Sequence, residues 1–457
     1  MKPIAQLLRR LPLFNSRRAV QLALSGRAPQ VKRTAVHDLG MGWAGNTVNT
    51  VIFRHHGVIS DGEFQFTAFY VDQCTLRLVQ RNLTTEQLDF YDLHGQYNLR
   101  DAHNSISLGM DRDGYLHISY DHHGSQLRYR RSLQPRSIHG LSDELPMTGA
   151  HEERVTYPCF ITPQADRDNS PLMLLYRDGC WNKGTARLKV YDEAQRTWSD
   201  RPDAILSGAE QRPWTSNPYW NHPVRGTDGS LHLSFVWRTD SLGQEARINN
   251  INVCYAKSLD EGRTWLTSRD RFYRLPITQV NVETVHAVSP GSNLINQTSM
   301  ALDSRNRPHI VFYADDADGI PQYQHIRFDG KQWVHQVISA RTETFSLQGG
   351  GTLQLPISRP EVLVDSKDNA WVIYRGDMTG NRMSVTKLSA PNYEFDSRKT
   401  AVLWSEDLAH AEPIIDRLRW QRQQVLTIFL QHNRQPNGDG ECEAFSAPAT
   451  LLDIQLS

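Results

Sequence analysis

The segment DGYLHISY, residues 113–120, begins with a turn signal and continues as a short strand that alternates apolar and polar residues. An Asp-Gly pair favours a tight turn, and the alternation that ends in an aromatic residue indicates a half-buried strand. A polar turn and a second short strand over 126–130 complete the unit. This unit decides the fold, because it recurs along the chain.

Seven segments of the chain follow this pattern. The aromatic residue that closes the first strand of each unit recurs at roughly 50- to 80-residue steps, at Tyr70, Tyr120, Tyr176, Phe235, Tyr313, Tyr374 and Phe429. The paired strands are predicted at 64–70 with 75–80, 116–120 with 126–130, 172–176 with 186–191, 231–237 with 252–256, 309–313 with 322–327, 371–374 with 383–388, and 425–430 with 450–454. The repeat predicts an all-β, seven-bladed β-propeller whose last blade is closed by a strand from the opposite terminus. A large β-sandwich and a parallel β-helix are the alternatives.

Residues 258–265, SLDEGRTW, match the Asp-box hairpin pattern S-x-D-x-G-x-T-W. The Asp260 side chain can cap its own turn, Gly262 permits a positive φ, and Trp265 can fill the space between strands. Asp boxes recur in sialidase-like and other propellers, and they are structural. The motif therefore supports the fold and says little about function.

Composition fits one large unit. The 457 residues contain 50 basic and 50 acidic side chains, so no overall field favours nucleic acid or an anionic membrane. No apolar run approaches the roughly 20 residues that cross a bilayer. The five cysteines are scattered without a C-x-x-C pair, which argues against a disulfide framework and a zinc ribbon. We expect an N-terminal arm over 1–35, a single catalytic propeller over 36–457, and a monomer.

The N-terminus carries a basic, mildly apolar stretch that Arg9, Arg10 and Pro12 interrupt. Ser16-Arg17-Arg18 faintly resembles a twin-arginine signal, but the apolar segment after it is short. We predict no secretory signal, which slightly favours a cytoplasmic over a periplasmic or secreted location.

Polar residues gather in the second unit, at Arg100-Asp101-Ala102-His103-Asn104 and at His122-His123. Loops at the face of a propeller surround its central depression, and blade packing does not explain such a cluster. We place His103 and His123 on neighbouring strands of one blade, where both can face one pocket. Adjacent side chains on a strand point to opposite faces, so only one of His122 and His123 should share the pocket with His103. Structural roles for these histidines are the alternative.

The third and fourth units add further candidates. Pro158 should restrict Tyr157 to an extended geometry, from which its phenol can enter the cavity. Arg177 ends a buried-looking strand and needs an anionic partner, either Asp178 or a substrate acid. The segment 217–223, NPYWNHP, concentrates aromatic and amide groups of the kind that bind carbohydrate. The alternative roles are core packing for Tyr157 and an interblade ion pair for Arg177.

These motifs in this order resemble the BNR-4 family: DAHNSIS at 101–107, DG at 113–114 with His117, DHH at 121–123, TYP-x-F at 156–160 and YRDG at 176–179. The family includes seven-bladed polysaccharide lyases of the ulvan lyase type and related rhamnosyl-glucuronate lyases. The resemblance runs from about Asn46 to Ser457. It implies a carbon–oxygen lyase that cleaves a polysaccharide next to a uronic acid by β-elimination, with His103, His123, Tyr157 and Arg177 as site residues. Asn104, Tyr219, Asn221 and His222 are the expected substrate-binding residues. One departure, CWNKG at 180–184, borders the expected pocket and leaves the choice of glycan open.

The residue types suit that chemistry. Arg177 can grip the uronate carboxylate with two hydrogen bonds and stabilise the enolate-like intermediate. His103, His123 and Tyr157 would supply the base and the acid. A histidine is favoured as base, with Tyr157 or the second histidine as acid. In the alternative, Tyr157 serves as both and the histidines hold the carboxylate.

No metal is needed for this reaction, although some relatives carry a structural ion. A zinc or calcium ion could be held here by Cys254, His222 and His286, whose spacing is not diagnostic. Two other functions fit the fold: a rhamnosidase- or sialidase-like glycoside hydrolase, and a non-catalytic propeller that binds glycans. A sialidase needs an arginine triad, and no ordered triad stands out in the sequence. The expected partner is a uronate-containing polysaccharide or oligosaccharide.

Overall fold

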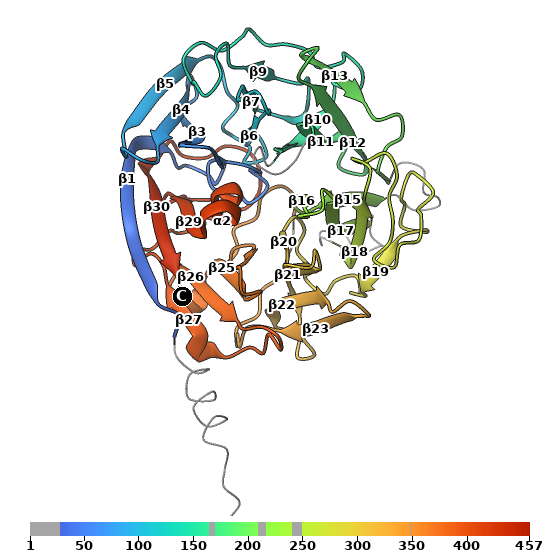
Figure 1. Cartoon of the computed structure of the whole chain (residues 1–457). Coiled ribbons are helices and arrows are strands. Elements are labelled where there is room, and N and C mark those ends of the chain that lie inside the picture. Colours follow the sequence, from blue (N-terminus) through green and yellow to red (C-terminus); the bar gives the residue numbers. More distant parts are fainter. Residues whose placement is uncertain (1–27, 164–169, 209–215, 240–248, 348) are drawn as a thin grey trace, which may run out of the picture.

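A computed structural model describes residues 28–163, 170–208, 216–239, 249–347 and 349–457. Within these residues the strands form seven antiparallel sheets. The sheets follow one another around a ring, in the order of the sequence (Figure 1). The chain is therefore a seven-bladed β-propeller, as the repeat predicts.

The blades have the following strands. The first blade contains β2 (Val58–Asp61), β3 (Phe64–Asp72), β4 (Thr75–Asn82) and β5 (Leu88–His94), and the second contains β6 (Ser107–Met110), β7 (Leu116–Ser119) and β9 (Tyr129–Arg131). The third contains β8 (His123–Ser125), β10 (Val155–Ile161), β11 (Met173–Cys180), β12 (Lys183–Asp192), β13 (Thr197–Asp200) and β14 (Leu206–Ser207). The fourth contains β15 (Ser216–Trp220), β16 (Val224–Arg225), β17 (Leu231–Thr239), β18 (Asn250–Ser258) and β19 (Glu283–His286).

The remaining blades are more regular. The fifth contains β20 (Ser299–Leu302), β21 (Pro308–Asp315), β22 (Pro321–Phe328) and β23 (Trp333–Val337), and the sixth contains β24 (Glu361–Val364), β25 (Ala370–Gly376), β26 (Arg382–Leu388) and β27 (Thr400–Val402). The seventh contains β28 (Ile414–Ile415), β29 (Val425–Leu430), β30 (Ser446–Leu456) and β1 (Val31–Trp43). Each predicted strand pair overlaps a pair of hydrogen-bonded strands.

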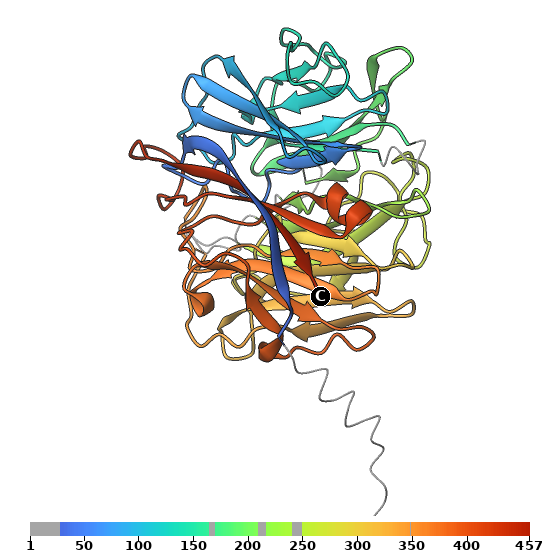
Figure 2. The same cartoon turned by 60° about the vertical axis from the view of Figure 1, so that its left-hand side comes forward.

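The ring is closed by strands from opposite ends of the sequence. β1 pairs antiparallel with β30, from Val31 opposite Leu456 to Trp43 opposite Ser446. The two strands lie on the outer side of the ring, at the left of Figure 1, and Figure 2 brings them to the front. The predicted boundary between arm and propeller, at residues 35 and 36, falls inside β1, because this strand belongs to the closing sheet. Residues 1–27 of the predicted arm lie outside the described residues.

Blade packing follows from strand composition. β17 buries Leu231, Leu233, Phe235 and Trp237, so the apolar side chains of the pattern enter the core between blades. Burying a large apolar side chain contributes about 1.5–3 kcal/mol. The Asp box follows β18 as predicted.

In that turn, Asp260 accepts a 2.8 Å hydrogen bond from the backbone N–H of Thr264. Gly262 has a φ of 80°, and Trp265 is buried.

Helical structure is sparse in the part of the chain that the structure describes. Helix α2 (Arg417–Gln423) connects β28 to β29 near the middle of the ring (Figure 1), and Asp416 caps it by accepting from the backbone N–H of Arg419. The 3₁₀ turns η1 (Asp377–Thr379) and η2 (Ser397–Lys399) lie in the sixth blade's connections. No helix in the described ranges has the length and apolar character to span a bilayer.

Candidate active site

A cavity of about 500 Å³ opens among the inner strands and their loops. Its lining comes from most blades and includes His103, His123, Tyr157, Arg177 and Tyr219. The structure thus brings the four predicted catalytic residues and one predicted binding residue together in one cavity.

His103 and His123 meet on a shared carboxylate. The Nδ1 atoms of His103 and His123 lie 2.6 and 2.5 Å from the two carboxylate oxygens of Asp101. The imidazole rings stack with their centroids 4.1 Å apart. Asp101 therefore orients both rings, a role that the sequence analysis did not assign to it.

The prediction that both histidines lie on strands of one blade is wrong. His103 lies in the loop before β6 in the second blade, whereas His123 begins β8, which pairs with β10 in the third. The chain crosses to the next sheet after β7, so the pair spans two blades. The expected separation of the adjacent histidines holds: the Nε2 atom of buried His122 accepts from the backbone N–H of Arg128.

The environment of His103 keeps its imidazole protonated at neutral pH. Burial acts to lower the pKa of His103, but hydrogen bonds to Asp101 and Asp439 and their negative charges outweigh it and raise the pKa to about 9. Asp439 comes from the seventh blade, and its carboxylate is 3.5 Å from the Nδ1 atom of His103. Although burial opposes it, hydrogen bonds from both histidines hold the pKa of Asp101 below its usual range.

Tyr157 lies in an irregular part of β10. Its φ is 55°, in the left-handed region, so the prediction of an extended backbone before Pro158 is wrong. A register shift between Thr156 and Cys159 accommodates this bend. A bulky residue with positive φ stores strain, which is found preferentially at functional sites.

The bend directs the phenol ring toward the cavity. The ring centroid of Tyr157 lies 5.7 Å from that of His103 and 5.1 Å from that of Phe53, and burial raises its pKa well above the usual value.

Arg177 is buried at 2% exposure in β11 and has no carboxylate partner among the described residues. Its Nη2 atom donates to Thr156 Oγ1 at 3.2 Å, while Nε and Nη1 find no hydrogen-bond partner there. The guanidinium carbon lies 4.9 Å from the centre of the Tyr157 ring. The predicted partner Asp178 instead pairs with Arg187, because its side chain leaves the opposite face of β11. An uncompensated buried cation at a cavity wall calls for an anionic ligand.

Three other arginines of the described ranges line the cavity, and each already has hydrogen-bond partners. Arg238 donates to the Tyr219 hydroxyl and to Asn250, Arg359 pairs with Glu412 at 2.8 Å, and Arg375 donates to backbone carbonyls. Sequence reasoning missed these residues. A signal was present, because Arg177, Arg238 and Arg375 each directly follow an aromatic residue near the end of a blade's long strand.

The other predicted binding residues have structural contacts. Asn104 donates to the carbonyl of Asn98, and Asn221 donates to Ser234 and accepts from the backbone N–H of Thr298. Neither residue lines the cavity, and His222 does not line it either. These three residues lie on the same segments as cavity-lining residues, but their side chains are buried between strands.

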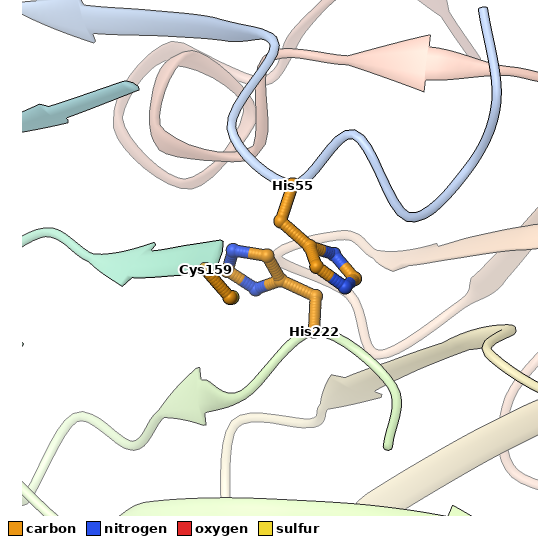
Figure 3. Close-up of side chains that lie close together, drawn as sticks. All are labelled: His55, Cys159 and His222. Carbon is orange, nitrogen blue, oxygen red and sulfur yellow. The ribbon is translucent and has the colours of Figure 1, made fainter. Parts of the chain in front are cut away.

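His222 instead joins a buried cluster with His55 and Cys159 (Figure 3). The predicted metal ligands Cys254 and His286 are not part of it: Cys254 is buried in β18, and His286 stacks on His335 in the outer strands. Among the described residues they do not group with His222, so the structure does not support the predicted ligand set. Asp101, His103, His123 and Asp439 form a second group of metal-ligand type, but the two Nδ1 atoms in that group are already engaged by Asp101.

Comparison with known proteins identifies the family of this chain. Residues 64–341 match the BNR repeat-containing family, and the chain belongs to that family. An ulvan lyase from Nonlabens ulvanivorans is 23% identical over 254 residues, which are 51% of this chain and 53% of that protein. The chain spans about half the length of this curated relative.

Two solved structures share the fold. The polysaccharide lyase Uly1 has a TM-score of 0.67 at 16% identity, over 93% of this chain and 99% of that one. A PL25 ulvan lyase bound to -[GlcA(1-4)Rha3S]- has a TM-score of 0.64 at 15% identity, over 91% and 97%. The protein is thus a seven-bladed propeller distantly related to ulvan lyases.

Proposed function

We propose that this protein is a polysaccharide lyase that cleaves a glycosidic bond next to a uronic acid by β-elimination. The observation that carries the proposal is the buried Arg177 guanidinium, which lines a cavity together with His103, His123 and Tyr157. Two of its nitrogens have no hydrogen-bond partner among the described residues. The distant relationship to ulvan lyases supports it. A glycan containing glucuronate, such as the one bound to the PL25 relative, is the proposed substrate class.

The charges around the two histidines suggest different roles for His103 and His123. Two stacked imidazoles on one carboxylate repel each other if both are charged. His103, between Asp101 and Asp439, is the ring that carries the charge. His123 is the candidate base, because its Nδ1 atom is held by Asp101 at 2.5 Å and its Nε2 atom remains for the substrate. This is the arrangement of an oriented general base.

In the proposed reaction, Arg177 and the His103 imidazolium neutralise the uronate carboxylate. His123 takes the proton from C5, the electron pair forms the C4–C5 double bond, and the bond from C4 to the leaving oxygen breaks. Tyr157 donates its proton to that oxygen. No water is added, so the product is an unsaturated uronate and a new free sugar end.

The lining of the cavity disfavours a hydrolase. Glycoside hydrolases commonly use two available carboxyl groups that flank the scissile bond. The carboxylates in the described lining are Glu412 and Asp439. Glu412 binds Arg359 and the backbone N–H of Ile52, and Asp439 accepts from the backbone N–H of Thr352.

The test is a screen of uronate polysaccharides and oligosaccharides, read by ultraviolet absorbance of the unsaturated product and by mass. Reactions run in ¹⁸O-labelled water separate the mechanisms. A lyase gives absorbance and no label at the new anomeric carbon, whereas incorporation of label would refute elimination. Binding without turnover on any uronate glycan would favour the non-catalytic alternative.

A further inference from the structure

A tryptophan stands at the rim of the candidate active site. Trp181 lines the cavity and is 58% exposed. The other tryptophans of the described ranges are buried or half-buried in the blades. Single exposed apolar side chains are common on protein surfaces, so exposure alone indicates nothing. Trp181 differs from such residues because it is exposed at a cavity that also contains the candidate catalytic residues.

The chain holds Trp181 on a short hairpin with a packed base. β11 and β12 pair in an unbroken register up to the turn, which consists of Trp181 and Asn182. A Cβ at Gly184 would lie 1.9 Å from the side-chain oxygen of Asn217, so this glycine lets the hairpin pack closely against β15 of the next blade. A short turn on a packed base restricts the indole, which lowers the entropy that is lost when a ligand binds.

The direction of β11 places Trp181 away from the reacting groups. Arg177 and Trp181 are four positions apart along this strand and its turn, and both line the cavity. At about 3.3 Å per residue, the two positions lie about 13 Å apart. Side chains stand roughly perpendicular to a strand, so their side chains keep much of this separation. It is wider than a pyranose ring, and a uronate bound by Arg177 therefore leaves Trp181 free for another sugar of the same chain.

The cavity has room for more than one sugar. Its volume of about 500 Å³ is in the range of sites that hold drug-sized ligands, which are larger than one pyranose ring. Its lining also includes Thr239, Asn249 and Asn296, whose neutral polar side chains can hydrogen-bond to sugar hydroxyls. A cavity with this volume and lining suits several linked sugars, of which one is the uronate.

An exposed indole is suited to the flat face of a sugar ring. The face of an aromatic ring is negative, and the C–H groups on the face of a pyranose are slightly positive. Stacking removes two apolar surfaces from water and adds this attraction, while the hydroxyls at the edge of the sugar keep their hydrogen bonds. Such a contact needs no charge on the sugar, so it complements the recognition of a carboxylate by Arg177.

We propose that Trp181 is a stacking platform for a sugar distant from the cleaved bond, and that the protein therefore favours chains longer than a disaccharide. This inference rests on the proposed lyase function, which assigns the uronate to Arg177. The indole contacts no reacting atom, so it stabilises the bound substrate and the transition state equally. Its contribution should therefore appear in KM and leave kcat almost unchanged.

The experiment compares substrates of different length. The probes are oligosaccharides of alternating rhamnose and glucuronate, two, four or six sugars long, with rhamnose linked to C4 of the glucuronate. The absorbance of the unsaturated product gives KM and kcat. In wild type, KM should fall about tenfold from the disaccharide to the hexasaccharide. Trp181→Ala should remove most of this gain with kcat within about twofold of wild type, and Trp181→Phe should keep part of it.

Phe272→Ala is the matched control. Phe272 is an aromatic residue with 74% exposure in the connection from β18 to β19, and it does not line the cavity. Its replacement should leave KM unchanged at every chain length. Trp181→Ala should also keep the melting temperature of wild type, because an exposed indole adds little to the core. A merely structural role for Trp181 would instead lower the melting temperature and affect all substrates alike.

The outcomes separate this inference from the lyase proposal. If the substrates are cleaved, a KM of Trp181→Ala that rises equally for short and long chains, or does not rise, would overturn the platform and leave the lyase intact. If none is cleaved, the lyase proposal fails, and isothermal titration calorimetry with the same oligosaccharides tests Trp181. Binding that strengthens with length in wild type but not in Trp181→Ala would support the platform, whereas no such difference, or no binding, would overturn it.

Discussion

Replacing Asp101 with Asn removes the carboxylate that both imidazoles share, and the structure gives the size of the effect. With a pKa of about 9, His103 is ~97% protonated at pH 7.5. Without Asp101, burial opposes only the more distant Asp439, at 3.5 Å. The pKa should fall toward its ordinary value of about 6.5, where ~10% of the rings are charged at pH 7.5. Turnover that needs the imidazolium should therefore fall about tenfold at this pH.

The assay is kcat/KM as a function of pH, followed by the absorbance of the unsaturated uronate. The charged form of His103 is present below its pKa and disappears above it. Wild type should therefore lose activity as the pH rises through about 9. Asp101→Asn should lose activity at a lower pH and recover near pH 6 the roughly tenfold part that comes from the charge of His103, whereas the part that comes from the orientation of His123 should remain lost at every pH. Asp439→Asn should move the alkaline limb less, because its carboxylate is farther away.

A variant Asp101→Asn whose alkaline limb stays near pH 9 would refute this reasoning. A loss that is uniform at all pH values would also refute it, because it would mean that Asp101 acts only by holding ring orientation.

Four further predictions follow from the described contacts. Arg177→Lys should lower kcat/KM about 10²–10³-fold on a uronate glycan, and Arg177→Ala should lower it further; equal rates on a carboxyl-reduced substrate would contradict the role of this residue. Tyr157→Phe should lower kcat about 10²–10⁴-fold without a change in circular dichroism, and near-normal turnover would remove Tyr157 from the mechanism. Asp260→Ala should lower the free energy of unfolding by about 1–3 kcal/mol in a urea titration and leave kcat/KM unchanged, so a catalytic defect would be unexpected. Deleting residues 446–457 should open the ring and make the chain sensitive to limited proteolysis at room temperature, whereas a resistant product would show that closure is dispensable.

The fold could be predicted from the sequence because the signals are local and repeated. Alternation at 116–120 or 231–237 reports which face of a strand is buried, and a turn residue reports where it ends. The Asp box is also local, since Asp260, Gly262 and Trp265 act within one hairpin. Crossovers are not local, and for this reason the sequence did not show that β8 pairs with β10.

The candidate site was only partly predictable, for the same reason. His103, His123, Tyr157 and Arg177 lie in ordered motifs, so a resemblance could select them. Asp439 reaches His103 from the seventh blade, and no spacing rule links positions so far apart. The positive φ of Tyr157 reverses the usual effect of a following proline, because a register irregularity in β10 imposes it.

The buried cluster is a further case of distant residues brought together. His55, Cys159 and His222 have no spacing that resembles a known metal motif, and each looks like an ordinary core residue in its own segment. Their convergence depends on the connection from β1 to β2, whose His55 ring lies 5.2 Å from the ring of His222 in the fourth blade. Such a site is visible only when the strands are placed in space.

The antiparallel pairing of β1 with β30 sets the order of events during synthesis. β1 leaves the ribosome early, yet its hydrogen-bonding partner is made only after the other six blades have been translated. Until then β1 presents an unpaired edge, which is a template for association with other chains. Closing so large a loop also costs more entropy than forming the hairpins within each blade. The nascent chain should therefore hold several formed blades around an open ring, and the cavity, whose wall needs both the second and the seventh blades, should become complete only in the last step of folding.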